Sequence, residues 1–112
     1  MKNLDQMRAA NSLNVSIRGG QDGGNSIAKK VSAMIRENGF LASMAFAKEK
    51  DVGYKDVFNA IIDHLRKAGQ LHGLPDNFDG FLAGLCQTDS ATLRAVTAEA
   101  MAYINYLRRF QR

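Results

Sequence analysis

Two blocks of basic residues are the part of this sequence whose chemistry is easiest to specify. The chain has 15 Lys and Arg against 11 Asp and Glu, a formal net charge of +4. Segment 26–50 contains five cations and two acids, and segment 90–112 contains four cations and one acid. Spaced cations on a helix surface can bind nucleic-acid phosphates without reading the bases. The cations are Lys29, Lys30, Arg36, Lys48, Lys50, Arg94, Arg108, Arg109 and Arg112.

Aromatic side chains that could stack on bases are scarce. Tyr103 and Tyr106 are the candidates, although a tyrosine at the buried edge of a helix is more often packed than free. The sequence has no signature of a helix-turn-helix, a zinc finger or an RNA-binding sheet. A phosphate-binding basic face is therefore the nucleic-acid chemistry that the residues indicate.

The sequence gives little support for a catalytic site or a metal site. His64 and His72 are eight residues apart across Gly69, whereas a helical metal pair needs a spacing of about three to five. A Cys86–His72 nucleophile pair is conceivable in space, but neither residue has a motif around it. The carboxylates are scattered and show no acid–base pairing. We expect no enzyme activity, no metal and no cofactor.

The elements that must position the basic residues are predicted to be helices. The chain has 112 residues, one proline and no alternating β-branched runs. It predicts an all-α fold: a compact single-domain bundle of about six helices over residues 1–112, with a long C-terminal helix. Four glycines within 19–25 predict a mobile loop, because glycine disfavours helix.

The segment 26–50 reads as two helices that meet at Gly39. Glycine directly after a periodic apolar run is the expected helix stop. The second helix is apolar nearly all round over 40–47, so we expect it to be buried. Asp51-Val52-Gly53 would then form a turn.

The remaining helices follow the apolar periodicity. One is predicted over about 3–17, one over about 54–68, one after a cap at Asp76 or Asn77, and one from Asp89-Ser90 to the end. Cys86 is expected to be a small core residue beside Leu82 and Leu85, and Gly80 and Gly84 could permit a close helix crossing. The buried stripe of the last helix is expected to be Leu93, Val96, Ala100, Ile104 and Leu107.

Two blocks of residues resemble a known family, the small helical subunit of type III-B CRISPR (Cmr) RNA-silencing effector complexes. The first block has a Ser-x-Ala-Lys-Lys start, an Ile-x-x-Asn-Gly hinge and an Ala-Phe-x-x-x-Lys ending within 26–50. The second, over 89–110, is similar to the last helix of the family, and Arg8-Ala9 fits a weaker pattern. Val31-Ser32 stands where the family often has proline, Tyr106 replaces a frequent Trp, and 69–88 shows no resemblance.

The resemblance implies a non-catalytic structural subunit of an antiviral ribonucleoprotein. Such subunits stack head to tail beside the backbone subunits, near the large subunit, and line the channel that holds guide and target RNA. The family blocks and the basic faces together predict RNA contacts at Lys29, Lys30, Lys50, Arg94 and Arg108, with Arg8 and Arg109 as weaker candidates.

Two alternatives remain open at this point. The chain could be a protein–protein adaptor whose last helix docks on a partner without touching RNA, or a small enzyme that uses Cys86. A single cysteine excludes an intramolecular disulfide and fits a cytoplasmic setting. Polar residues interrupt any apolar run at the N-terminus, so we expect no secretory signal, and no segment has the length of a membrane span.

Overall fold

The computed structural model describes residues 3–18, 23–50 and 52–110, with backbone only at 23–25. These residues form six α-helices and no strand, so the predicted all-α fold with a long last helix is confirmed. The helices are α1 (Leu4–Ser12), α2 (Gly23–Asn38), α3 (Phe40–Glu49), α4 (Val52–Lys67), α5 (Phe78–Gln87) and α6 (Ser90–Phe110).

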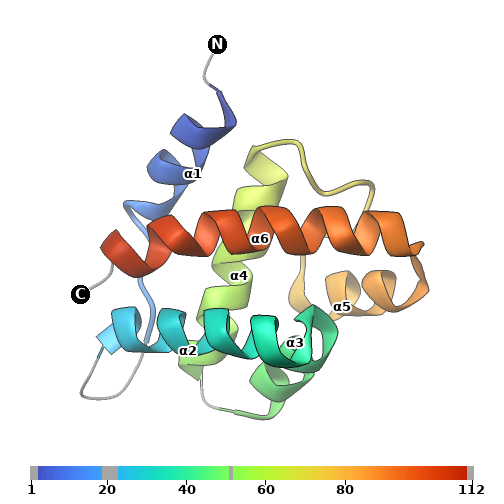
Figure 1. Cartoon of the computed structure of the whole chain (residues 1–112), viewed down its shortest axis with the longest axis horizontal. Coiled ribbons are helices and arrows are strands. Elements are labelled where there is room, and N and C mark those ends of the chain that lie inside the picture. The colour runs from blue at the N-terminus through green and yellow to red at the C-terminus, as the bar shows by residue number, and fades with distance from the viewer. Residues whose placement is uncertain (1–2, 19–22, 51, 111–112) are drawn as a thin grey trace.

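Helix α4 is the centre of the core. Its apolar side chains recur at helical spacing, and Val57, Phe58, Ile61 and Leu65 are completely buried. The helix packs against all five others, and in Figure 1 it crosses behind α2 and α6. The apolar periodicity that predicted a helix over about 54–68 therefore marks the surface on which the remaining helices assemble.

Helices α2 and α6 form the front layer and run in opposite directions side by side (Figure 1). In the predicted stripe of α6 only Leu93 is partly exposed, and Val96, Ala100, Ile104 and Leu107 are buried. On α2, Ile27, Ala28, Val31 and Ile35 face the core. The exposed faces of these two helices carry Lys29, Lys30, Arg36, Arg94 and Arg109, whereas Lys48 and Lys50 lie at the end of α3.

The predicted hinge between α2 and α3 is confirmed. Gly39 has a φ of +90°, which a residue with a Cβ rarely adopts. The hydroxyl of Ser43 donates to the Gly39 carbonyl at 2.8 Å, and the Gly39 amide donates to the Ile35 carbonyl at 2.9 Å. The chain therefore turns sharply from one helix into the next without losing these backbone hydrogen bonds.

The first helix ends earlier than predicted, at Ser12 rather than near Ile17. The backbone amide and the guanidinium of Arg18 both donate to Asp56 at the start of α4. Asn14 and Ser16 also have low helix propensity. The segment after α1 therefore forms a tertiary contact with α4 instead of a further helical turn.

The glycine-rich loop predicted over 19–25 is wrong at 23–25, where α2 has already begun. Residues 19–22 of that prediction lie outside the described residues. Ile27 and Ala28, one turn further on, are buried against the core. Packing of this turn overrides the weak helix propensity of glycine.

The turn predicted at Asp51-Val52-Gly53 is also replaced by helix. Val52 and Gly53 form the first turn of α4, and Asp51 lies outside the described residues. A Cβ at Gly53 would collide with the carbonyl oxygen of Arg18 and approach the Ile27 side chain at 2.5 Å. Glycine here allows the chain after α1 and the start of α2 to pack directly on α4.

Three expectations about burial and packing were wrong. Cys86 is exposed, because it lies beside the buried stripe of α5 rather than within it. In α3, Ala42, Ala45 and Phe46 are exposed, because only one side of this helix faces the bundle. Gly80 and Gly84 pack against Leu74 and Pro75 of the preceding loop, not against another helix.

Candidate nucleic-acid interface

Lys29 and Lys30 lie on the outward face of α2. Both side chains are exposed, whereas the neighbouring Ile27, Ala28 and Val31 are buried. Within the described part of the chain, neither ammonium forms an ion pair. Their charges are therefore available to an external anion.

Arg94 and Arg108 lie near opposite ends of α6. Arg94 is exposed and Arg108 is half-buried, and neither forms an ion pair with a described residue. Arg94 borders an apolar groove of about 490 Å³ where α6 meets the α2–α3 hinge. The groove is lined by Gly39, Phe40, Leu93, Arg94, Thr97, Ala98 and Met101.

The antiparallel layer brings only some of the predicted residues together. In Figure 1 the first half of α2 lies beside the last half of α6, the half that contains Arg108 and Arg109, while Lys29 and Lys30 lie at the middle of α2. Arg94 lies beside the hinge at the other end. Lys50 caps the far end of α3, with its ammonium 5.6 Å from the centre of the Phe46 ring. The predicted contacts therefore form a dispersed basic surface rather than one pocket.

Arg8 is held in a partly buried ion pair that no local sequence pattern indicated. Its Nε and Nη2 donate to the two carboxylate oxygens of Glu99 at 2.8 and 2.7 Å. The Glu99 side chain is 8% exposed and that of Arg8 is 23% exposed. The hydrogen bonds to Glu99 raise the pKa of Arg8, so the guanidinium is firmly charged but already engaged.

His64 completes this network from α4. It is completely buried, and its Nε2 lies 2.9 Å from Glu99 while its Nδ1 lies 2.9 Å from the amide nitrogen of Asn11. Because that amide can only donate, Nδ1 accepts and Nε2 carries the proton, which is the neutral imidazole. Burial lowers the pKa of His64 despite the attraction of Glu99. Histidine is here a structural residue that joins three helices.

Glu99 stays ionised at the centre of the network. Burial by itself raises the pKa of Glu99, but the hydrogen bonds from Arg8 and His64 outweigh burial and leave that pKa below its usual range. A weak signal for this role existed in the sequence: Glu99 directly precedes Ala100 of the predicted buried stripe, and His64 lies beside the stripe of α4.

Both candidate stacking tyrosines already have partners inside the molecule. Tyr103 is buried, lies parallel to the His64 ring at 4.3 Å, and donates its hydroxyl to the Asn11 carbonyl at 2.8 Å. Burial raises the pKa of its phenol. Tyr106 is half-buried and donates to the Asp5 carboxylate. Neither ring is a free platform for a base.

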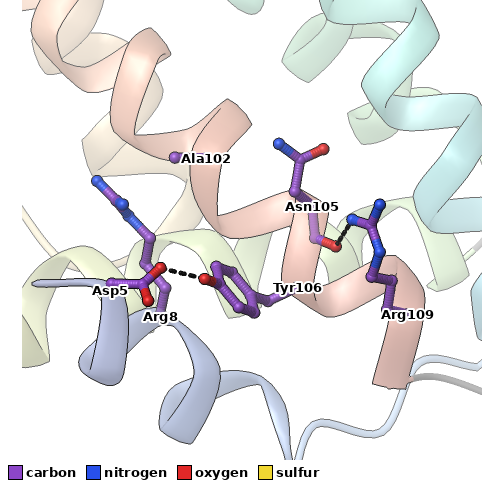
Figure 2. Close-up of a pocket in the computed structure, with 6 residues that line it drawn as sticks. All are labelled: Asp5, Arg8, Ala102, Asn105, Tyr106 and Arg109. Carbon is purple, nitrogen blue, oxygen red and sulfur yellow. Dashed lines mark hydrogen bonds between the residues drawn. The ribbon is translucent and has the colours of Figure 1, made fainter.

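A groove of about 460 Å³ lies along the contact between α1 and α6 (Figure 2). Asp5 and Arg8 line it from α1, and Asn105, Tyr106 and Arg109 line it from α6. Figure 2 shows the Tyr106 hydroxyl pointing to Asp5 and the Arg109 guanidinium bonded to the Asn105 carbonyl at 2.8 Å. Arg109 is exposed, and its remaining donors can reach a phosphate at the edge of the groove.

Metal ligands do not converge in the described ranges: no group of three His, Cys, Asp or Glu side chains lies within reach of one ion. His72 is exposed in the loop after α4 with a φ of +54°. None of the helices in the described ranges is both long enough and apolar enough to cross a membrane.

A comparison with protein families agrees with the resemblance seen in the sequence. The family model for CRISPR-associated protein (Cas_Cmr5) matches residues 7–112, which include both basic blocks and the last helix. No curated protein and no solved structure matches the chain. A match over nearly the full length is not explained by a shared helical pattern in one segment. The chain therefore belongs to the CRISPR-associated Cmr5 family, the small subunits of type III-B Cmr complexes.

Proposed function

We propose that this structural subunit contacts the phosphates of guide and target RNA through its basic surface. The observation that supports the proposal most is the exposure of Lys29 and Lys30 on α2 and of Arg94 on α6, two antiparallel helices that pack side by side, with no ion-pair partner among the described residues. Lys50, Arg108 and Arg109 extend the surface. Arg8 is the weakest member, because two of its three guanidinium nitrogens already bind Glu99.

The same proposal includes a structural, non-catalytic role in the cytoplasm. Copies of the chain stack head to tail along the backbone subunits and adjoin the large subunit of the effector. Head-to-tail contacts use two different surfaces of each copy and can therefore extend as a filament. In this arrangement base pairing selects the sequence, and the small subunit needs only to bind backbone charge.

The salt dependence of RNA binding tests the phosphate contacts. We expect the triple variant Lys29→Ala, Lys30→Ala, Lys50→Ala to bind single-stranded RNA more weakly. The slope of log affinity against log salt should fall by about two, at roughly 0.7 per lost contact on a single strand. The measurement is a titration of the full chain with labelled RNA at several salt concentrations.

A matched control removes cations that already form ion pairs within the chain. Arg66 and Lys67 both bind Asp63, at 2.6 and 3.0 Å, so Arg66→Ala with Lys67→Ala should lower the salt slope less per removed charge than the triple variant does. If the control and the triple variant lower the slope per removed charge equally, the loss reflects net charge alone and the assigned contacts are wrong.

The second candidate function is a protein–protein adaptor, and the apolar groove beside the α2–α3 hinge favours it. Phe40, Leu93 and Met101 line this groove with apolar surface. An adaptor would bind a protein partner with weak salt dependence and would show no affinity for RNA. The titration above therefore separates the two candidates.

A further inference from the structure

Phe46 is an exposed ring that was not among the candidates for base stacking in the sequence. It was expected to be buried with the rest of α3, but 41% of its surface is exposed. Phe110 is exposed as well, yet no cation or second ring lies against it among the described residues. Phe46 differs because its neighbours hold it in place and bring a positive charge to it.

Two side chains fix the surroundings of Phe46. Tyr54 of α4 packs edge-to-face with it, with ring centres 5.5 Å apart and ring planes at 83°. The Lys50 ammonium lies over the Phe46 ring at 5.6 Å from its centre. Because Tyr54 packs against it from a second helix, the ring loses less freedom on binding a ligand than an isolated exposed ring would.

The charge next to the ring indicates the kind of ligand. Lys50 forms no ion pair with any described residue. The acidic residue next to it, Glu49, does not pair with it either, so the Lys50 charge is not neutralised by an ion pair. A phenyl ring has no hydrogen-bonding group and can contact any base through its flat face, once the Lys50 ammonium moves from that face onto a phosphate. A nucleotide joins a flat, weakly polar base to an anionic phosphate, which is the combination that a ring beside an ammonium fits.

We propose that Phe46, Tyr54 and Lys50 form a stacking site for an unpaired base of single-stranded RNA, with the adjacent phosphate on Lys50. This inference rests on the proposed RNA-binding function and adds to it a contact that is indifferent to sequence. Stacking is not screened by salt, so it should contribute to affinity even where the phosphate contacts are weakened.

The test compares RNA with and without bases. The full chain is titrated with a short single-stranded RNA and with an abasic oligomer of the same length and charge. Phe46→Ala should weaken binding of the RNA by about fivefold to a hundredfold and leave binding of the abasic oligomer unchanged. Phe46→Leu, which keeps apolar surface but removes the ring, should weaken RNA binding as Phe46→Ala does. Phe46→Trp, which keeps an aromatic ring, should bind RNA about as tightly as the parent chain.

Leu13→Ala is the control, because it removes an apolar side chain that is 59% exposed and lies outside this site. It should not change either affinity. Thermal unfolding of each variant establishes that the fold is kept. If Phe46→Ala and Phe46→Leu both bind RNA as the parent chain does, the stacking site is refuted.

The remaining outcomes distinguish this inference from the proposed function. If RNA affinity is unchanged in Phe46→Ala while the lysine triple variant still loses salt slope, the phosphate contacts stand and the stacking site does not. If Phe46→Ala instead loses binding to another subunit of the complex with RNA affinity intact, the ring belongs to a protein interface and the proposal is overturned. A parent chain that binds neither oligomer overturns both.

Discussion

At the scale of single residues, the best-defined feature is the buried group of Arg8, Glu99, His64 and Asn11. One carboxylate accepts from a guanidinium and an imidazole, and the amide of Asn11 satisfies the other imidazole nitrogen. A buried charge is tolerated only when it is paired and hydrogen-bonded in this way. The group therefore fixes how α1 attaches to α4 and α6.

Glu99→Gln should destabilise the fold through this group. The variant keeps the size of the side chain but leaves Arg8 without its counter-charge and removes one of the two acceptor oxygens that Arg8 and His64 share. We expect a loss of about 2–3 kcal/mol in the free energy of unfolding, below the usual cost for a fully buried pair because Arg8 is partly exposed. Urea denaturation measures it.

Asp63→Asn is the matched control for Glu99→Gln. It removes a carboxylate that pairs with Arg66 and Lys67 at the surface, so its cost should stay under about 1 kcal/mol. Equal losses in the two variants would show that the buried group is no more important than a surface pair.

The same residues predict a loss of stability on acidification. Burial lowers the pKa of His64 below the unfolded value of about 6.5, so the unfolded state binds the proton more readily. The stability that this neutral histidine contributes is complete above about pH 6.5 and falls as the pH drops from there toward its folded pKa. The slope reaches at most about 1.4 kcal/mol per pH unit. The lowered pKa of Glu99 acts in the same direction at lower pH.

Urea denaturation between about pH 7.5 and about pH 5 measures this slope. His64→Gln should flatten the curve just below about pH 6.5, because no group then titrates at this position. A curve of unchanged slope in the variant would assign the acid sensitivity to other groups.

The candidate site was predictable only in part at this scale. Exposure of Lys29, Lys30 and Arg94 followed from the apolar stripes beside them, because a helix face opposite a buried stripe must face water. The partnership of Arg8 with Glu99 joins residues 91 positions apart. Such a pairing depends on how helices cross and leaves no local pattern.

At the scale of helices, the sequence predicts interiors better than ends. The stripes of α4 and α6 depend on the 3.6-residue period, which is a local property, and they were predicted correctly. The end of α1 and the starts of α2 and α4 depend on contacts between Arg18, Gly53 and Ile27. Residues there that usually form turns are helical instead, because tertiary packing outweighs their low helix propensity.

Gly53→Ala tests that argument. The added methyl group would meet the backbone of Arg18 and the Ile27 side chain, so the start of α4 must move away from both. We expect a loss of about 1–3 kcal/mol in unfolding free energy, as for overpacking, although alanine is the better helix former. Thermal unfolding with a calorimeter measures it.

Gly84→Ala is the comparison for Gly53→Ala. Its methyl group would meet mainly the end of the Leu74 side chain, which can move aside. The gain in helix propensity should then leave the variant within about 1 kcal/mol of the parent chain. A Gly53→Ala protein as stable as Gly84→Ala would mean that the close approach is not a constraint.

At the scale of the whole molecule, the long last helix sets the reach of the proposed RNA surface. Arg94 and Arg108 are fourteen residues apart on α6, which corresponds to roughly 21 Å at about 1.5 Å per residue. No single phosphate can contact both. A stacked strand needs about six steps of about 3.4 Å to connect them.

Strand length should therefore decide whether the two arginines act together. With an RNA of about three nucleotides, each single variant should weaken binding only slightly, because the other arginine remains as an alternative site, and Arg94→Ala with Arg108→Ala should lose more than the product of the two single losses. With an RNA well beyond about six nucleotides, the fold-losses of the single variants should multiply in the double variant, as expected for distant contacts made simultaneously. Titrations of the full chain with an RNA length series measure this. If the losses multiply for the shortest RNA as well, the arginines act through the overall charge of the molecule and not as two separate contacts along one strand.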